Sequence, residues 1–214
     1  MNRRKILLLI ATQLLFWGCG GSKPVEPQEK TAEPQSDLAE TYFRIADVYF
    51  EKQNYSQAIE FYEKAAELQP HFAKTYQNIG VAYRYIHDYN QALEYYEKAL
   101  KLTSGDSIRS LAQLYSNIGE IYIQKQDYDK TIEYCKRAIE LDPYYTGTYL
   151  NMGVAYRSKQ NYNLAIEFYK KVIELDSRYA ADTYYYIGEA LIKKGDKDKG
   201  LQYKNKAIEL GYEP

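Results

Sequence analysis

Residues 76–96 read YQNIGVAYRYIHDYNQALEYY, and residues 149–169 repeat the pattern as YLNMGVAYRSKQNYNLAIEFY. The Asn-Ile-Gly core recurs at residues 117–119, and Ile187-Gly188 gives a further copy without the asparagine. With Ala46 placed in the same register, successive copies are separated by 34, 39, 34 and 35 residues. Self-similarity at this period is typical of a solenoid in which short helical units stack on one another.

Each copy is predicted to form two amphipathic helices. We number every copy from its own first residue, and the five copies start at Ala39, Ala73, Ala112, Thr146 and Ala181. Positions 4, 7, 8 and 11 fall within one arc of a helix at about 100° per residue. Position 18 is occupied in the five copies by Ser56, Asn90, Asp129, Asn163 and Asp198. These are good N-cap residues, so the second helix is expected to begin there.

The units resemble the tetratricopeptide repeat, whose pattern runs aromatic-x2-Leu-Gly-x2-Tyr, then Ala-x3-aromatic, then Pro. Position 4 is tyrosine in all five copies, while the closing proline is present only as Pro70 and Pro143. The resemblance covers residues 39–214 and implies an all-α fold, a right-handed α-solenoid of five tandem helix-turn-helix repeats. The repeats are expected at 39–72, 73–106, 107–145 with a lengthened first helix, 146–179, and 180–214 as a polar C-terminal cap.

The first residues are predicted to be a targeting segment. Arg3, Arg4 and Lys5 precede an apolar run at residues 6–17, which is too short to cross a bilayer comfortably but is typical of an export signal. The Gly18-Cys19 junction resembles the signal peptides of bacterial lipoproteins, although Phe16 and Trp17 depart from the usual pattern. This resemblance implies a signal peptide at 1–18 and lipid attachment at Cys19. Ordinary cleavage near Gly20 and an uncleaved anchor remain alternatives.

Residues 19–38 are rich in proline and glutamate and poor in apolar side chains, so a disordered tether is expected there. The whole chain has a formal net charge of −1 and an isoelectric point near 6.2, which gives no reason to expect a nucleic-acid partner. The two histidines have no catalytic partner at a meaningful spacing. We therefore predict no enzymatic activity, no cofactor, no metal site and no small-molecule substrate. Cys135 is expected to be an inert core thiol.

The resemblance also implies where a partner binds. In tetratricopeptide proteins the first-helix face opposite the packing stripe, at positions 2, 5, 6, 9, 12 and 13, lines a concave peptide groove. The residues expected in this groove are Asn78, Asn117, Asn151, Arg84, Arg157, Phe43, Tyr85 and Tyr185. The asparagine amides offer donors and acceptors to an extended backbone, and the two arginines are placed to bind an acidic group of the ligand. Relatives that clamp a free carboxylate use lysine and asparagine on this face of the first repeat, where positions 5 and 9 are here Phe43 and Asp47, so that chemistry is not expected.

Two functions follow from these features. The first is a lipid-anchored protein–protein interaction scaffold or adaptor of the bacterial cell envelope, on the outer membrane facing the periplasm, held to the membrane by acyl chains on Cys19. Its layout resembles the tetratricopeptide lipoproteins that help to assemble outer-membrane proteins or pilus secretins. The alternative is a carbohydrate- or peptidoglycan-binding module that uses tyrosines beyond those of the repeat framework. These surplus tyrosines are Tyr85, Tyr144, Tyr145, Tyr179, Tyr185, Tyr186 and Tyr212.

Overall fold

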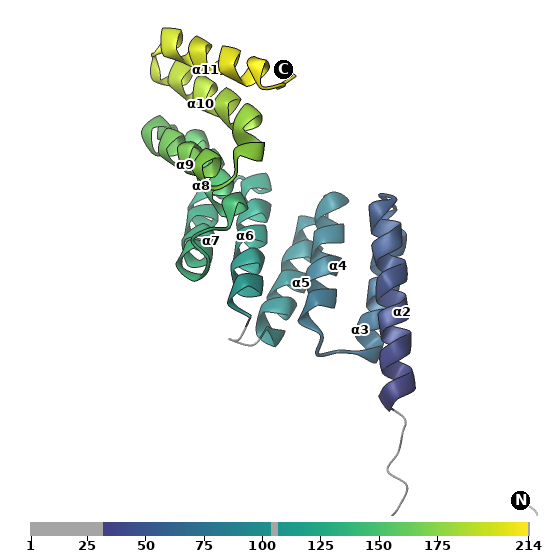
Figure 1. Ribbon diagram of the computed structural model, residues 1–214. Coiled ribbons are helices and arrows are strands. Elements are labelled where there is room, and N and C mark those ends of the chain that lie inside the picture. Colours follow the sequence, from purple (N-terminus) through teal and green to yellow (C-terminus); the bar gives the residue numbers. More distant parts are fainter. Residues whose placement is uncertain (1–31, 104–106, 214) are drawn as a thin grey trace, which may run out of the picture. The chain divides into compact units, whose positions relative to one another are not determined.

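The computed structural model describes residues 32–103 and 107–213, and in these ranges the chain forms ten α-helices, one short 3-10 helix and no strand. The helices are α2 (Ala32–Glu51), α3 (Tyr55–Leu68), α4 (Ala73–Tyr85), α5 (Tyr89–Leu102), α6 (Ile108–Gln124), α7 (Tyr128–Leu141), α8 (Thr146–Ser158), α9 (Tyr162–Leu175), α10 (Ala180–Lys194) and α11 (Lys197–Glu209), with η1 at Ser177–Tyr179 (Figure 1). The expected all-α fold is confirmed. The predicted signal peptide and Cys19 lie outside the described residues.

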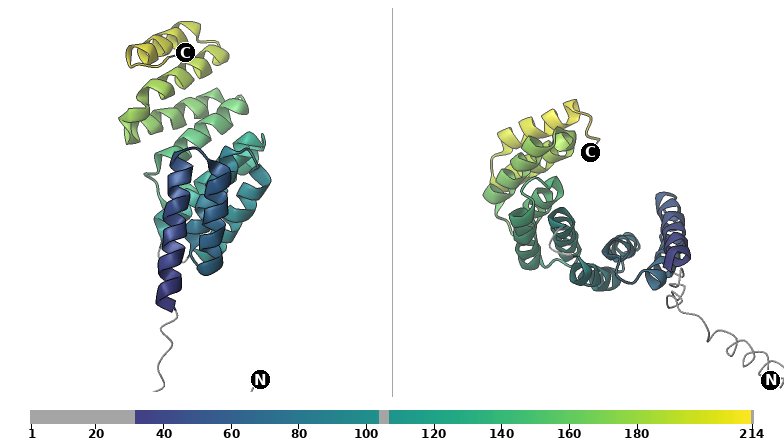
Figure 2. Two further views of the ribbon diagram at one scale, coloured as in Figure 1. Left: turned by 90° about the vertical axis from the view of Figure 1, so that its right-hand side faces the viewer. Right: turned by 60° about the horizontal axis from the view of Figure 1, so that its bottom comes forward.

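The contacts of the chain group residues 34–214 into one unit. Within this unit the second helix of each repeat packs against the first helix of the next, as α3 does on α4, α5 on α6, α7 on α8 and α9 on α10. The helix pairs therefore follow one another in a curved row (Figure 2). None of the described helices combines the length and the apolar character that a membrane span requires.

The turn inside each repeat is made by one left-handed residue followed by a capping residue. Position 15 has positive φ in every repeat, at Gln53, His87, Gln126, Gln160 and Gly195. Position 16 then caps the second helix, because its side chain accepts a hydrogen bond from the backbone N–H three residues later. The capping residues are Asn54, Asp88, Asp127, Asn161 and Asp196. The predicted caps at position 18 are therefore wrong, since the left-handed residue reverses the chain two residues earlier than expected.

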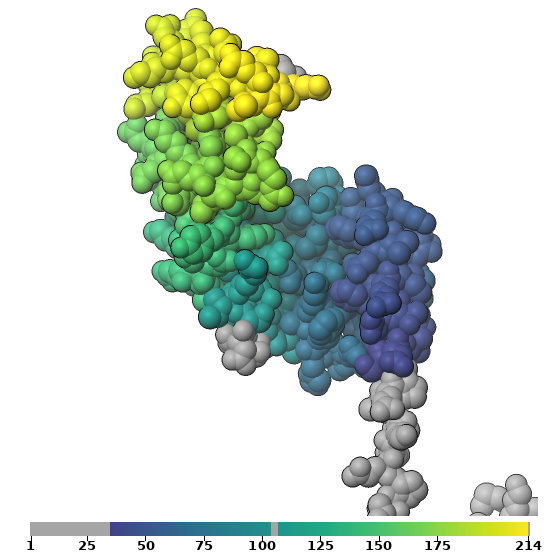
Figure 3. Space-filling model, viewed as in Figure 1, coloured from purple at the N-terminus to yellow at the C-terminus, as the bar shows by residue number. Residues whose placement is uncertain are grey.

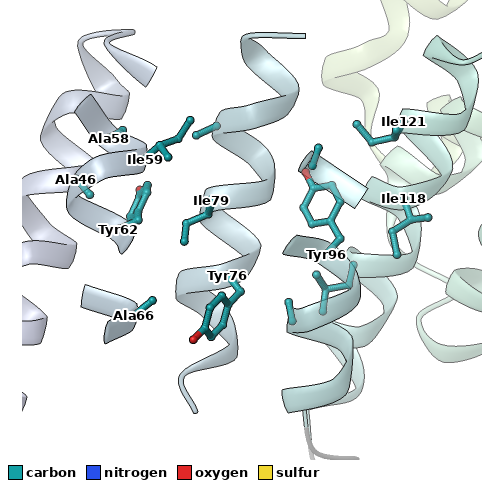
Figure 4. Packing of buried hydrophobic residues seen from close by; sticks show 14 residues of the cluster. Ala46, Ala58, Ile59, Tyr62, Ala66, Tyr76, Ile79, Tyr96, Ile118 and Ile121 are labelled. Carbon is teal, nitrogen blue, oxygen red and sulfur yellow. The ribbon is translucent and has the colours of Figure 1, made fainter. Parts of the chain in front are cut away.

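Small residues at position 8 let the two helices of a repeat touch. An added Cβ at Gly80 would lie 2.7 Å from Cδ1 of Tyr96, and one at Gly153 would lie 2.3 Å from Cε1 of Tyr169. The two tyrosines are fully buried, and Figure 4 shows the Tyr96 ring between helices of the core. In the third repeat the place of the ring is taken by Cys135, which is buried as expected. Burial raises the pKa of its thiol to about 12.

Helix α2 begins at Ala32, so the last residues of the predicted tether are helical. Pro34 falls in the first turn of this helix, where the missing N–H costs nothing. The added turn is in contact with the repeat, because Gln69 Nε2 donates a hydrogen bond to Ser36 Oγ at 3.0 Å. Helix α6, with 17 residues, is four residues longer than α4 or α8, and Ser107 is its N-cap residue.

The fifth repeat differs from the expected polar cap. Leu201 and Ile208 of helix α11, and Leu210 directly after it, are about half exposed. The polar residues that replace aromatic ones, at Lys197 and Lys204, predicted a polar cap, but Leu201 of the expected apolar stripe is left exposed together with Ile208.

Candidate functional site: a groove on the first three repeats

Three hollows lie on the first-helix face of the first three repeats. The first has a volume of about 420 Å³ and is lined by Phe43 and Phe72 among others. The second, of about 530 Å³, lies between the second and third repeats, and the third, of about 220 Å³, lies between the first and second. Their lining residues include positions 2, 5, 6 and 9 of the repeat, where the peptide groove was predicted.

The hollows share lining residues and so form one surface. Asp47 lines the first and third hollows, Lys74 the first and second, and Asn78 the second and third. We call the surface around Phe43, Asp47, Phe72, Lys74 and Asn78 the N-terminal groove. These five residues contribute two aromatic rings, one carboxylate, one ammonium group and one amide to a continuous depression.

A hydrogen-bonded chain of three residues crosses the groove between the first and second repeats. The Tyr62 hydroxyl donates to Asp47 Oδ1 at 2.5 Å, and Asn78 Nδ2 donates to the same hydroxyl at 3.3 Å. Burial raises the pKa of Tyr62 well above its usual value, and the adjacent Asp47 carboxylate raises it further. The hydroxyl therefore stays protonated, which fixes the direction of the chain from Asn78 to Asp47.

Two of the three asparagines at position 6 donate hydrogen bonds to the preceding repeat. Asn151 Nδ2 donates to the Ser116 carbonyl oxygen at 3.1 Å, as Asn78 does to Tyr62, and Asn117 is half-buried. Position 6 thus lies against the preceding repeat, because the stacking of helix pairs brings it there. This differs from the expectation of a row directed only at a ligand. One amide of the predicted row, that of Asn78, lines the N-terminal groove.

The two predicted arginines already have acidic partners. Arg84 forms an ion pair with Glu120, and Arg157 Nη1 lies 3.0 Å from Glu189 Oε2. Both acids are at position 9 of the following repeat, and all four side chains are half-buried. These arginines were expected to bind an acidic group of the ligand. In the structure they instead pair with acids of the next repeat and so join the repeats. Sequence reasoning treated each helix face alone and so missed pairing between repeats.

Of the three aromatic residues predicted for the groove, one lines it and two pack against other rings of the protein. Phe43 lies in the groove, with its ring 5.4 Å from that of Tyr62. Tyr85 stacks on Tyr55 at 4.8 Å and Tyr185 stacks on Tyr212 at 4.2 Å between ring centroids, so these rings pack within the protein. A carbohydrate platform needs ring faces open to solvent, and these two tyrosines give their faces to other rings.

Sequence reasoning missed Phe72 and Lys74 in the groove. Phe72 precedes α4 as its N-cap residue, and Lys74 is at position 2 of the second repeat, on the predicted face. The available signal was the aromatic character of Phe72 at the end of the first repeat, whose position 5 is also aromatic, at Phe43. Among the described residues no group of three or more His, Cys, Asp or Glu side chains is placed to hold a metal ion.

Stacked helix pairs with a hollowed first-helix face define an α-solenoid of the protein-interaction scaffold type. The chain belongs to the tetratricopeptide repeat family: one tetratricopeptide model matches residues 37–104 and 110–178, and a second matches residues 181–210. No curated protein matches the chain significantly in sequence.

Solved structures agree with this assignment. A crystal structure of the MamA protein is 28% identical, with a TM-score of 0.66 over 81% of this chain and 91% of that one. YrrB, described as a TPR protein with an unusual peptide-binding site, is 25% identical, with a TM-score of 0.62 over 85% of this chain and 91% of its own. PilF of Pseudomonas aeruginosa, at 21% identity and a TM-score of 0.71 over 85% of this chain and 80% of its own, shares the fold.

Proposed function

We propose that this protein is a lipid-anchored adaptor of the bacterial cell envelope that holds a peptide segment of a partner protein in the N-terminal groove. The observation that carries the proposal is the continuity of three hollows over the first three repeats through Asp47, Lys74 and Asn78. The similarity to YrrB, a TPR protein with a peptide-binding site, supports a peptide as the ligand.

The groove has the chemistry of a site for an extended peptide. Phe43 and Phe72 lie with ring centroids 6.0 Å apart and line the first hollow, which suits an apolar ligand side chain. The Asn78 amide uses one donor on Tyr62, which leaves its oxygen and a second N–H for a ligand backbone. Lys74 at the junction of two hollows adds a cation for an acidic ligand group.

The groove is tested by selecting binders from a random peptide library on the full-length protein. Lys74→Glu reverses the charge shared by two hollows, and Gln77→Trp fills the second hollow. We expect the selected peptides to lose at least about tenfold in affinity for either variant, which corresponds to about 1.4 kcal/mol. Lys101→Glu is the matched control, because Lys101 is exposed on the second helix of the same repeat. Peptides that bind all four proteins equally would place the ligand elsewhere and overturn the proposal.

The anchor is tested separately. Cys19 follows the apolar run at residues 6–17, and two or more acyl chains are enough for stable membrane attachment. Cys19→Ser should abolish the incorporation of labelled fatty acid and release the protein from membranes, while groove binding stays unchanged. A wild-type protein that takes up no acyl label would instead favour ordinary cleavage near Gly20 or a retained anchor.

A further inference from the structure

The first repeat leaves open a helix face that every later repeat buries. Position 10 of the first helix is 48% exposed at Val48. The equivalent residues of the other four repeats are 0% exposed, namely Ala82, Ile121, Ala155 and Ala190. Position 3 behaves in the same way, since Thr41 is exposed while Thr75 and its later equivalents are buried. In repeats two to five this face is covered by the preceding repeat.

The fifth repeat leaves open the complementary face. Leu201 and Ile208, at positions 21 and 28 of the repeat, are 46% and 52% exposed. In the fourth repeat the residues at these positions, Ile166 and Ile173, pack against the core cluster that contains Ile187 of α10. Helix α11 therefore carries the apolar residues that an internal repeat uses to bind the next one. Figure 3 shows α11 and α2 at opposite ends of the described helices.

The first and fifth repeats also carry, without a neighbouring repeat, the two residues of a polar contact that joins internal repeats. Lys159 Nζ, at position 14, lies 2.5 Å from Asp129 Oδ1, at position 18 of the preceding repeat. Lys125 Nζ donates to Asn90 Oδ1 at 2.9 Å in the same relationship. The corresponding residues at the two ends are Lys52 in the first repeat and Asp198 in the fifth, and both are exposed. Their charges are opposite, as in the Lys159–Asp129 pair.

We propose that α11 of one molecule packs against α2 of a second copy, so that the repeats continue head to tail from one molecule to the next. The contact would bury Val48 against Leu201 and Ile208 and would bring Lys52 to Asp198, as the internal interfaces do. It also brings Arg44 near Lys204, but each of these cations has a carboxylate partner, Glu40 and Glu189 respectively. The two surfaces differ, so the association is open-ended and each assembly keeps one free face at either end.

Sedimentation velocity of the full-length protein in a mild non-ionic detergent tests this association. The mean mass of the wild type should rise with concentration, and Val48→Glu or Ile208→Glu should weaken association at least about tenfold, because each places a charge in an apolar contact. Ile108→Glu is the matched control: Ile108 is 52% exposed, like Ile208, but lies at the start of α6. The wild type and all three variants carry the same N-terminal residues, so association through an anchor would be equally strong in all of them.

Mixing the two face variants gives the decisive result. Val48→Glu keeps an intact α11 face and Ile208→Glu keeps an intact α2 face, so their mixture should form one-to-one pairs and nothing larger. In the wild type, Lys52→Asp should weaken association and the further change Asp198→Lys in the same chain should restore it.

Three outcomes would overturn the proposal. One is a wild type that stays monomeric at every concentration. Another is a mixture of the face variants that forms no pairs. The third is a Val48→Glu protein with altered thermal stability and unaltered association, since that result would mean that residues 1–31 of the same molecule cover α2.

Discussion

Arg157 and Glu189 join the first helix of the fourth repeat to the first helix of the fifth, with Nη1 and Oε2 3.0 Å apart. The same pairing of positions 12 and 9 joins the second repeat to the third through Arg84 and Glu120. At the interfaces in between, these positions are apolar, for example Phe50 and Val81, which line one hollow between the first two repeats. The pairing of positions 12 and 9 therefore alternates between ionic and apolar from one interface to the next, with a unit of two repeats.

We expect Glu189→Gln to destabilise the protein by about 1–2 kcal/mol, because Arg157 and Lys204, both mostly buried, lose their shared anionic partner. This value lies between that of an exposed pair and that of a fully buried one. Urea unfolding followed by circular dichroism measures the loss. Glu133→Gln is the control, since Glu133 pairs with Arg137 on the surface of one helix, and a change below about 0.5 kcal/mol is expected there. Equal losses from both variants would show that the pair between repeats adds nothing beyond a surface pair.

Two glycines of helix α8 should respond in opposite ways to alanine. A Cβ at Gly153 would lie 2.3 Å from the buried ring of Tyr169, so Gly153→Ala should destabilise the protein by about 1–3 kcal/mol. The nearest atom to a Cβ at Gly147 is a Tyr145 ring carbon at 3.5 Å, an ordinary contact, so Gly147→Ala should stabilise the helix by about 0.5–1 kcal/mol. Melting temperatures in calorimetry measure both. A Gly153→Ala protein as stable as the wild type would mean that the Tyr169 ring can move aside.

The repeats were predictable because each repeat position carries the same packing demand five times. The helix ends and the partners between repeats were less so. Asn161 and Asn163 are equally good capping residues by type. The left-handed conformation of Gln160 places Asn161 at the cap, but the sequence does not signal this conformation, because the residue is glutamine and not glycine. Likewise Arg157 looked free on its own helix, because its acid lies 32 residues further along the chain, at Glu189. Local patterns do not contain such contacts.

The difference between the two capping candidates is directly testable. The Asn161 side chain accepts a hydrogen bond from the Leu164 N–H at 3.3 Å, so Asn161→Ala should cost about 0.5–2 kcal/mol. Asn163 is exposed inside the first turn of α9, where alanine has the higher helix propensity, so Asn163→Ala should be neutral or slightly stabilising. Urea midpoints of the two variants give the comparison. If Asn163→Ala were the more destabilising variant, the residue at position 18 would be the cap of the helix.

The buried thiol of Cys135 predicts a loss of stability at alkaline pH. Burial raises its pKa from 9.0 to about 12, so above pH 9 the unfolded chain releases a proton that the folded chain retains. The stability contributed by the protonated thiol is present below pH 9 and falls by roughly 1 kcal/mol per pH unit as the pH rises from 9 towards about 12.

Cys135→Ala removes this titration, because alanine has no ionisable group. The variant is expected to be less stable than the wild type at pH 8, since it leaves a small cavity beside Gly119. Between pH 9 and pH 10, however, the wild type should lose about 1 kcal/mol more than the variant, as measured by urea unfolding at each pH. In a Cys19→Ser background, where Cys135 is the one remaining cysteine, the folded protein should also resist thiol reagents at pH 8 and react on unfolding. Equal pH dependence in the two proteins, or rapid labelling of the folded chain, would show that this thiol is open to solvent.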